Sequence, residues 1–277
     1  RYFSLGEVSM TDDAGNGINS INPFEMAVDL GYSRKLSDSF SMGVALRYIY
    51  SDLAFDETMA TDDVKGASAF AADISGYYTT YPMVGRNECQ WSLGFNISNI
   101  GSKVSYSGGN EPAFLPANLK LGTMFMFPLA DYHTLALALD VNKLLVPVKP
   151  RLTDYEDQIA YEDALQDWKD MSPISGIFKS FNDAPGGFKE ELREITYSIG
   201  AEYSYNQQFF LRGGYYHESA YKGNRQYFGL GAGFALNVVR LDAAYMIATA
   251  QSSPLDQTLR FSLTFDMDGL RDLFGRR

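Results

Sequence analysis

This 277-residue chain is poor in cysteine, in basic residues and in long apolar runs, and each shortage excludes a class of protein. Its single cysteine, Cys89, excludes an intramolecular disulfide framework. Only 23 Lys and Arg stand against 34 Asp and Glu, a net charge of -11. That balance argues against nucleic acid as a partner, because nucleic-acid binding usually needs a basic patch. No uninterrupted apolar run reaches the ~18 residues of a transmembrane helix.

Aromatic residues, in contrast, are plentiful, with 19 Tyr and 19 Phe. Their clearest pattern lies between Phe24 and Asp52, where apolar side chains take every second position on both sides of the polar turn 37–39. The positions between them are small, polar or charged. Since alternate residues of a strand point to opposite faces, this stretch predicts a hairpin with one apolar face. Strands of about ten residues suit tilted crossings of a bilayer roughly 30 Å thick.

The same alternation recurs and predicts an all-β transmembrane fold, an antiparallel outer-membrane β-barrel of about twelve strands. The expected strands cover 3–10, 24–33, 40–51, 70–78, 91–97, 119–127, 135–141, 195–203, 209–215, 228–236, 239–247 and 259–265. Long and short connections alternate strictly between them, which is typical of outer-membrane barrels. If the short turns are periplasmic, the long loops are extracellular and the tail 268–277 is periplasmic.

Charged residues of both signs fall on the face opposite to the apolar one. They are Asp29, Arg47, Asp73, Lys120, Asp140, Glu202, Arg212, Arg240, Asp242 and Arg260. We expect them to form ion pairs that fill a narrow lumen, in preference to a selectivity ring.

The two-residue alternation of apolar side chains gives way to a helical spacing only in the insert 146–194. We expect this insert to form short helices on an extracellular loop, within a single barrel domain that covers 1–277. Thr153 and Glu156 match a capping box, which predicts a helix start there. That helix would carry Tyr161, Leu165 and Trp168 on one side.

A second helix is predicted to begin at Ser172-Pro173, because Ser caps helices and Pro is favoured at the first helical position. An apolar stripe at helical spacing follows. This stripe packs on the barrel rim, or it binds a partner or a hydrophobic ligand. The two interpretations are compatible, because one helix can bury half of its stripe and expose the rest. The candidate partner-binding residues are therefore Trp168, Ile174, Ile177, Phe178 and Phe181.

Five stretches resemble the PorV (LptO) family of outer-membrane proteins of the type IX secretion system of Bacteroidetes. They are YSRKLSDSFSMGVALRYIYSD (32–52), LALDVNKLLVP (137–147), SPISGIFKSFNDAPGGFKEEL (172–192), GNRQYFGLGAGF (223–234) and SPLDQTLRFSLTFD (253–266). The resemblance implies a FadL-like barrel of about fourteen strands, of which about two, with an N-terminal plug segment, would be missing here. The start at Arg1, without an initiator Met or signal peptide, suggests a processed or truncated chain.

The resemblance also implies a non-enzymatic function. Such a protein would take cargo leaving the Sov translocon, bind the cargo's C-terminal signal domain and pass it to the PorU sortase complex. Outer-membrane lipid or lipopolysaccharide would surround it. No cofactor is expected, and the acid pairs at 12–13 and 62–63 are more simply solvated loop residues than a calcium site.

Two alternatives stay open. A FadL-like transporter of hydrophobic molecules rests on fold analogy alone. The name LptO marks an association with lipopolysaccharide O-deacylation, which makes a hydrolase the second alternative. His217 and Ser219, two apart on one strand face, with Asn224 across the loop, are the candidate residues.

Overall fold

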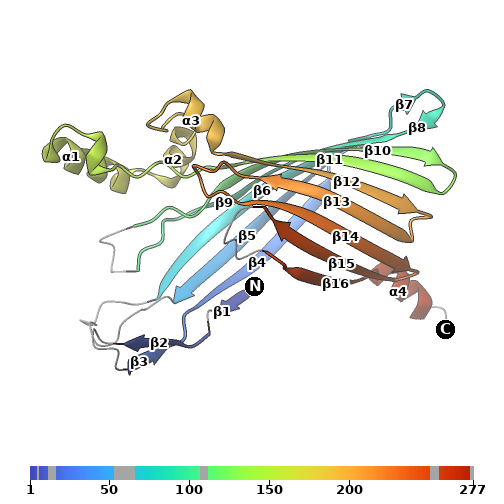
Figure 1. Cartoon of the computed structure of the whole chain (residues 1–277), viewed down its shortest axis with the longest axis horizontal. Coiled ribbons are helices and arrows are strands. Elements are labelled where there is room, and N and C mark those ends of the chain that lie inside the picture. The colour runs from blue at the N-terminus through green and yellow to red at the C-terminus, as the bar shows by residue number, and fades with distance from the viewer. Residues whose placement is uncertain (5, 12–16, 53–65, 107–111, 250–255, 275–277) are drawn as a thin grey trace.

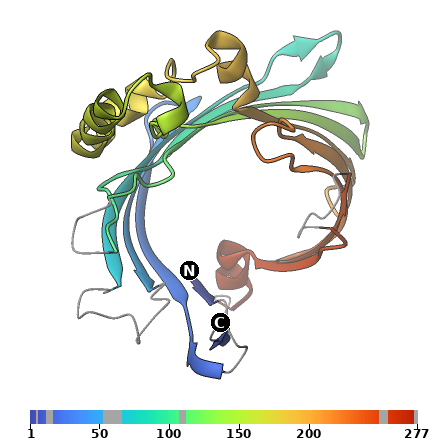
Figure 2. The ribbon, with the colours of Figure 1, turned by 60° about the vertical axis from the view of Figure 1, so that its left-hand side comes forward.

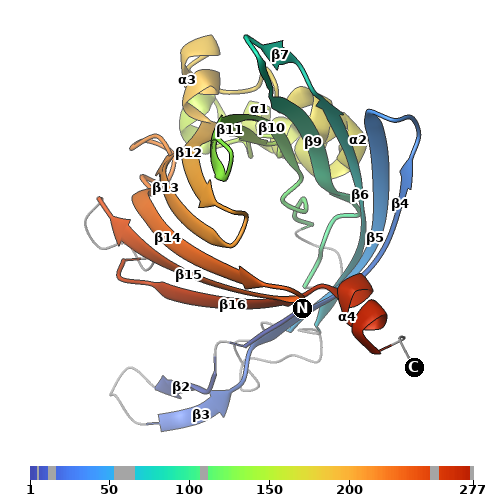
Figure 3. The ribbon, with the colours of Figure 1, turned by 90° about the vertical axis from the view of Figure 1, so that its right-hand side faces the viewer.

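The computed structural model describes residues 1–4, 6–11, 17–52, 66–106, 112–249 and 256–274. Its main body is one antiparallel sheet of twelve strands, in the order β1-β4-β5-β6-β9-β10-β11-β12-β13-β14-β15-β16 (Figure 1). Seen from the side, the sheet curves into the wall of a barrel (Figure 3). The predicted fold class, an antiparallel outer-membrane barrel with few helices, is confirmed.

The strands of this wall are β1 (Tyr2–Ser4), β4 (Phe24–Lys35), β5 (Phe40–Asp52), β6 (Ala67–Thr80), β9 (Gln90–Gly101), β10 (Asn118–Ala130), β11 (His133–Leu144), β12 (Ile195–Tyr205), β13 (Phe209–His217), β14 (Gln226–Leu236), β15 (Val239–Ala248) and β16 (Leu259–Phe265). Two small hairpins stand apart from it, β2 (Val8–Thr11) with β3 (Gly17–Ile21) and β7 (Met83–Val84) with β8 (Asn87–Glu88). The helices are η1 (Leu152–Asp154), α1 (Gln158–Asp170), α2 (Pro173–Lys179), α3 (Phe188–Arg193) and α4 (Met267–Phe274). None of the described helices is long and apolar enough to cross a membrane.

The apolar face of the wall points outward, as the alternation predicts. Leu30 pairs with Leu46, and these side chains are 75% and 63% exposed. On the far side of the wall, Phe261 of β16 is 68% exposed. Exposed apolar side chains repeated on every strand are stable only against lipid.

Nine of the ten charges predicted for the lumen, all except Arg260, form ion pairs with other described residues, as expected. Arg47 pairs with Asp29 and Asp73, from the strands on either side of its own. Arg212 of β13 lies 2.5 Å from Glu202 of β12 and 2.6 Å from Asp242 of β15. Arg47 therefore joins three neighbouring strands on the inner face, and Arg212 reaches across β14 to link β12, β13 and β15.

One irregularity in the wall was not predicted, a β-bulge at Asn99. The register of β6 and β9 shifts between Ala72 and Ile74, and Asn99 takes a φ of 58°. Its amide donates to the Asp73 carboxylate at 2.8 Å, and its side chain contacts Arg47. The extra residue thus lies where the Arg47 ion pairs are assembled.

The prediction of a first strand at 3–10 was wrong. The chain turns at Gly6, whose φ of +76° is strained for any other residue, so β1 and β2 are separate strands. Part of the expected loop 12–22 is the strand β3. The tail begins with a helix that the sequence analysis did not predict, α4.

The sheet ends at β1 and β16. Within the described residues, no strand pairing joins β16 to β1 or β4, so the wall is open along this seam. The short turns, and α4 with them, lie at one end of the wall, which we call the short-turn end. The helical insert lies at the opposite, long-loop end (Figure 1).

Candidate partner-binding surface

The insert between β11 and β12 begins with a different cap from the predicted one. Helix α1 starts at Gln158, and the side chain of Asp157 accepts a hydrogen bond from the amide of Ala160 at 2.7 Å. Thr153 lies in the short η1, where its hydroxyl donates to Asp154. The capping box was therefore wrong: Tyr155 is extended and separates the two turns, so Thr153 cannot cap α1.

Trp168 of α1 holds the insert to the rim. Its ring packs edge-on against Phe114 at 5.1 Å, and its indole N–H donates to the carbonyl of Pro147 at 3.2 Å. Lys103 donates to the carbonyl of Lys169 at 2.6 Å and lies over the Phe114 ring. Burial lowers the pKa of Lys103. Trp168 is thus partly buried by contacts within the chain.

Helix α2 begins as predicted, with the Ser172 hydroxyl accepting from the amide of Ser175 at 3.2 Å. Its inner side is set by Gly176, because a Cβ there would lie 2.8 Å from the Phe114 ring. Because α2 lies so close to Phe114 on this side, its opposite side faces solvent. Ile174 is 61% and Phe178 is 73% exposed.

The predicted stripe is therefore divided. Ile177 is half-buried, and Phe181, 46% exposed, lies beyond the end of α2. The structure brings Ile174, Phe178 and Phe181 into solvent, while Trp168 lies against Phe114.

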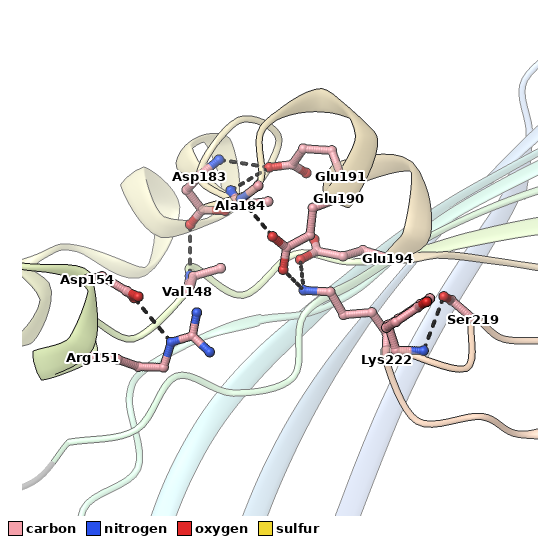
Figure 4. Close-up of polar contacts among 12 residues, drawn as sticks. Val148, Arg151, Asp154, Asp183, Ala184, Glu190, Glu191, Glu194, Ser219 and Lys222 are labelled. Carbon is pink, nitrogen blue, oxygen red and sulfur yellow. Dashed lines mark hydrogen bonds and ion pairs between the residues drawn. The ribbon is translucent and has the colours of Figure 1, made fainter.

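A third helix, α3, was missed by the sequence reading. The Gly187 that precedes it has a φ of 66°, a conformation that favours glycine. Helix α3 is fixed by five residues that we call the rim clasp. Lys143 of β11 lies 2.7 Å from Glu191 and 2.8 Å from Glu194, and Lys222 lies 2.6 Å from Glu190 and 3.0 Å from Glu194. Figure 4 shows Lys222 reaching toward both of its partners.

Glu191 is the most enclosed member of the clasp, 6% exposed. Its second oxygen accepts from the amides of Asp183 and Ala184, both at 2.8 Å (Figure 4). Burial by itself would raise the pKa of Glu191, but the hydrogen bonds from Lys143 and these amides outweigh it and lower the pKa. Burial raises the pKa of Asp183, which accepts from the amide of Val148.

The loop 218–225 supplies Lys222 and is itself held by an ion pair. Glu218, 4% exposed, accepts two hydrogen bonds from the guanidinium of Arg225, both 2.8 Å long. The Arg225 hydrogen bond lowers the pKa of Glu218. At its tip Tyr221 is 76% exposed.

The candidate hydrolase residues are not assembled. The ring of His217 stacks on Tyr197 at 4.8 Å. The hydroxyl of Ser219 accepts from the amide of Tyr221, and the Ser219 carbonyl accepts from the amide of Asn224. Within the described chain, no side-chain hydrogen bond joins His217, Ser219 and Asn224.

The described part of the chain holds no group of three His, Cys, Asp or Glu that could bind a metal ion. The acid pairs at 12–13 and 62–63 lie outside the described residues.

Several solved structures are similar in fold to this chain. The outer membrane phospholipase A from Escherichia coli is 10% identical with a TM-score of 0.38, covering 88% of this chain and 84% of that chain. The Ralstonia pickettii toluene transporter TbuX is 12% identical with a TM-score of 0.36, covering 95% and 74%. A triple mutant of the Rhodopseudomonas blastica porin is 10% identical with a TM-score of 0.30, covering 95% and 86%. These similarities concern the fold alone.

No match was found among curated proteins. A family model described as type IX secretion system protein PorV matches residues 1–151, which is more than half of the chain. The matched part runs from β1 through β11 to the first residues of the insert. The chain therefore belongs to the PorV family, and it is an outer-membrane component of a type IX secretion system.

Proposed function

We propose that this protein is a non-enzymatic carrier that binds the C-terminal signal domain of cargo leaving the Sov translocon and passes it to the PorU attachment complex. The insert 146–194 is the cargo-binding part of a single barrel domain, 1–277. The long-loop end faces the cell exterior, and α4 lies in the periplasm.

The observation that carries this proposal is the exposed apolar side of the insert. Ile174, Phe178 and Phe181 stay in solvent although α2 packs tightly through Gly176 on its other side. Because the insert is held by Trp168 and the rim clasp, the apolar side is presented on a fixed support. Large aromatic side chains on such surfaces are the usual binding hot spots.

The double variant Phe178→Ala with Phe181→Ala tests the proposal. Truncation of a hot-spot residue costs about 2 kcal/mol or more, and about 1.4 kcal/mol is a tenfold change in affinity. We expect binding of a purified cargo signal domain, measured by calorimetry in detergent, to weaken by more than tenfold. The wall should stay folded and heat-modifiable, because neither residue belongs to a strand.

Two matched controls complete this experiment. Ile159→Ala removes an equally exposed apolar side chain, 73%, from α1, outside the stripe. Ser219→Ala removes the candidate nucleophile. Both variants should bind cargo normally. Normal binding by the double variant would reject the insert as the cargo site, and lipid deacylation that Ser219→Ala abolishes would favour the hydrolase.

One cavity favours a second candidate function, transport of a hydrophobic molecule. A space of about 450 Å³ lies inside the wall, lined by apolar residues such as Ile49, Val104 and Leu115 and by Arg47. The guanidinium of Arg47 is already paired with Asp29 and Asp73. A bound alkyl compound in protein purified without cargo would support transport, and Ile49→Asp should then abolish its retention.

A further inference from the structure

Helix α3 lies on the outer face of the barrel wall. Lys143 shares the strand face of Leu137 and Leu139, which are 48% and 40% exposed on the lipid side. Lys143 is only 8% exposed, because Glu191 and Glu194 of the α3 segment cover it. Figures 2 and 3 agree, showing α3 (gold) outside the curve of the sheet, beside β11 and β12.

The height of α3 along the wall can be estimated from the strand pairing. Val141 pairs with Tyr197, and Tyr197 pairs with His217, whose ring stacks on it. Outward-facing aromatic residues near strand ends mark the membrane boundary of such barrels. Lys143 is two residues beyond Val141, about 7 Å along a strand. Helix α3 therefore lies at the level of the lipid headgroups.

The side chains of α3 divide into faces. At 100° per residue, Glu190, Glu191 and Glu194 gather on one side, and the apolar pair Phe188 and Leu192, four apart, takes another. The glutamates are occupied by Lys143 and Lys222. Phe188 and Leu192 are left 77% and 52% exposed.

We propose that α3 is an interfacial membrane anchor, whose Phe188 and Leu192 enter the lipid surface at the long-loop end. The surface is continuous with the lipid-facing wall just below it, and apolar side chains at headgroup depth are stable there in the way of an amphipathic interfacial helix. Lys189 lies exposed on the remaining side of the helix, where a long cationic side chain can reach headgroup phosphates, while the Arg193 guanidinium beside it lies over the Tyr221 ring at 4.4 Å. This inference rests on the outer-membrane location and does not depend on cargo binding by α2.

The rim clasp holds α3 at this position on the wall. A lysine on the lipid-facing side near the boundary needs a counter-charge, and Lys143 finds two, from Glu191 and Glu194. The clasp thus attaches α3 to the wall at a fixed depth, with its apolar pair turned from the glutamate side.

A spin label reports the depth of α3 directly. In a Cys89→Ser background, the label is attached at Phe188→Cys in the full chain, reconstituted in nanodiscs of phosphatidylcholine and phosphatidylglycerol. Leu139→Cys serves as the lipid reference. Gln166→Cys, an exposed polar position on α1, serves as the water reference. Heat-modifiable migration checks folding of each variant, and Leu192→Cys replaces Phe188→Cys if the latter does not fold.

We expect the label on α3 to collide with oxygen several-fold more often, relative to a water-soluble nickel chelate, than the label at 166. Its ratio should lie between those of the two references. A ratio equal to that at 166 would overturn the anchor. Cargo binding by the same variant stays normal in either case, because Phe178 and Phe181 are unchanged, so failure here and failure of the carrier function are distinguishable.

Discussion

Adjacent residues of β11 face different surroundings. Leu137 is 48% exposed on the lipid side and pairs with Phe125 and Ala201 on the neighbouring strands. Ala138, one residue further, lies on the inner face and pairs with Met124 and Gly200. Moving by one residue along the strand therefore moves the side chain from the lipid hydrocarbon to the polar lumen.

The substitutions Leu137→Arg and Ala138→Arg should differ for this reason. A cation at the bilayer midplane costs about 2–4 kcal/mol, whereas an arginine in the polar lumen is far less costly. We expect Leu137→Arg to reduce the yield of heat-modifiable barrel several-fold and Ala138→Arg to leave it near the parent value. Phe261→Arg and Ser262→Arg give a second pair on β16. Equal damage by both members of a pair would mean that the inner and outer faces have been misassigned.

At the scale of elements, α3 depends on charges that lie far apart in the sequence. Lys143 and Glu191 are 48 residues apart, and Lys222 and Glu190 are 32 apart. The pKa values of Glu190 and Glu191 are lowered in the fold. Burial by itself would lower the pKa of Lys222, but its hydrogen bonds to Glu190 and Glu194 raise it. The two ions of each pair thus stabilise the fold over the neutral range.

Acid should release α3. A carboxylate with a lowered pKa stabilises the fold above its ordinary pKa of about 4.3, and this contribution is lost as the pH falls through the lowered value. Lys222 stays protonated throughout this window. Asp183 acts in the opposite direction, because its pKa is raised and acid relieves its burial. Glu190 and Glu191, whose pKa values are lowered, outnumber Asp183. We therefore expect a spin label at Lys189→Cys to be immobile near pH 7 and to gain mobility below about pH 4.

The variant Glu194→Gln is the matched control for the clasp. It removes the carboxylate shared by both lysines. Its label should already be mobile at neutral pH, with a smaller change on acidification. A label that is equally immobile at pH 7 and pH 3 in the parent chain would show that the clasp does not hold α3.

At the scale of the whole molecule, the wall separates two kinds of connection. The turns after β4, β10, β12 and β14 are short and lie at one end, while the insert lies at the other. Outer-membrane barrels keep short turns in the periplasm and long loops outside. This asymmetry is the basis of the proposed orientation.

An epitope inserted after Glu156, between η1 and α1, should be stained by antibody on intact cells. The segment is exposed and precedes the Asp157 cap, so the insertion leaves α1 in place. An epitope between Asn237 and Val238, in the turn from β14 to β15, should be stained only after the outer membrane is opened. The reverse result would invert the orientation.

The twelve-stranded wall, its outward apolar face and the start of α2 could all be predicted from the sequence. Each is encoded locally. A strand between lipid and lumen needs an apolar side chain at every second residue, and a Ser-Pro cap acts within one helical turn. Such patterns can be recognised without knowing which residues pack against them.

The candidate site could be predicted only in part. The stripe 174–181 was predicted from its spacing, but Trp168 and Gly176 both pack against Phe114, which only the folded chain brings to them. The same is true of the Asn99 bulge and of the rim clasp, where Glu191 meets a lysine on another element. Periodicity records which face of an element is apolar. Which charged or aromatic group meets that face is decided by contacts across tens of residues, and these leave no local trace in the sequence.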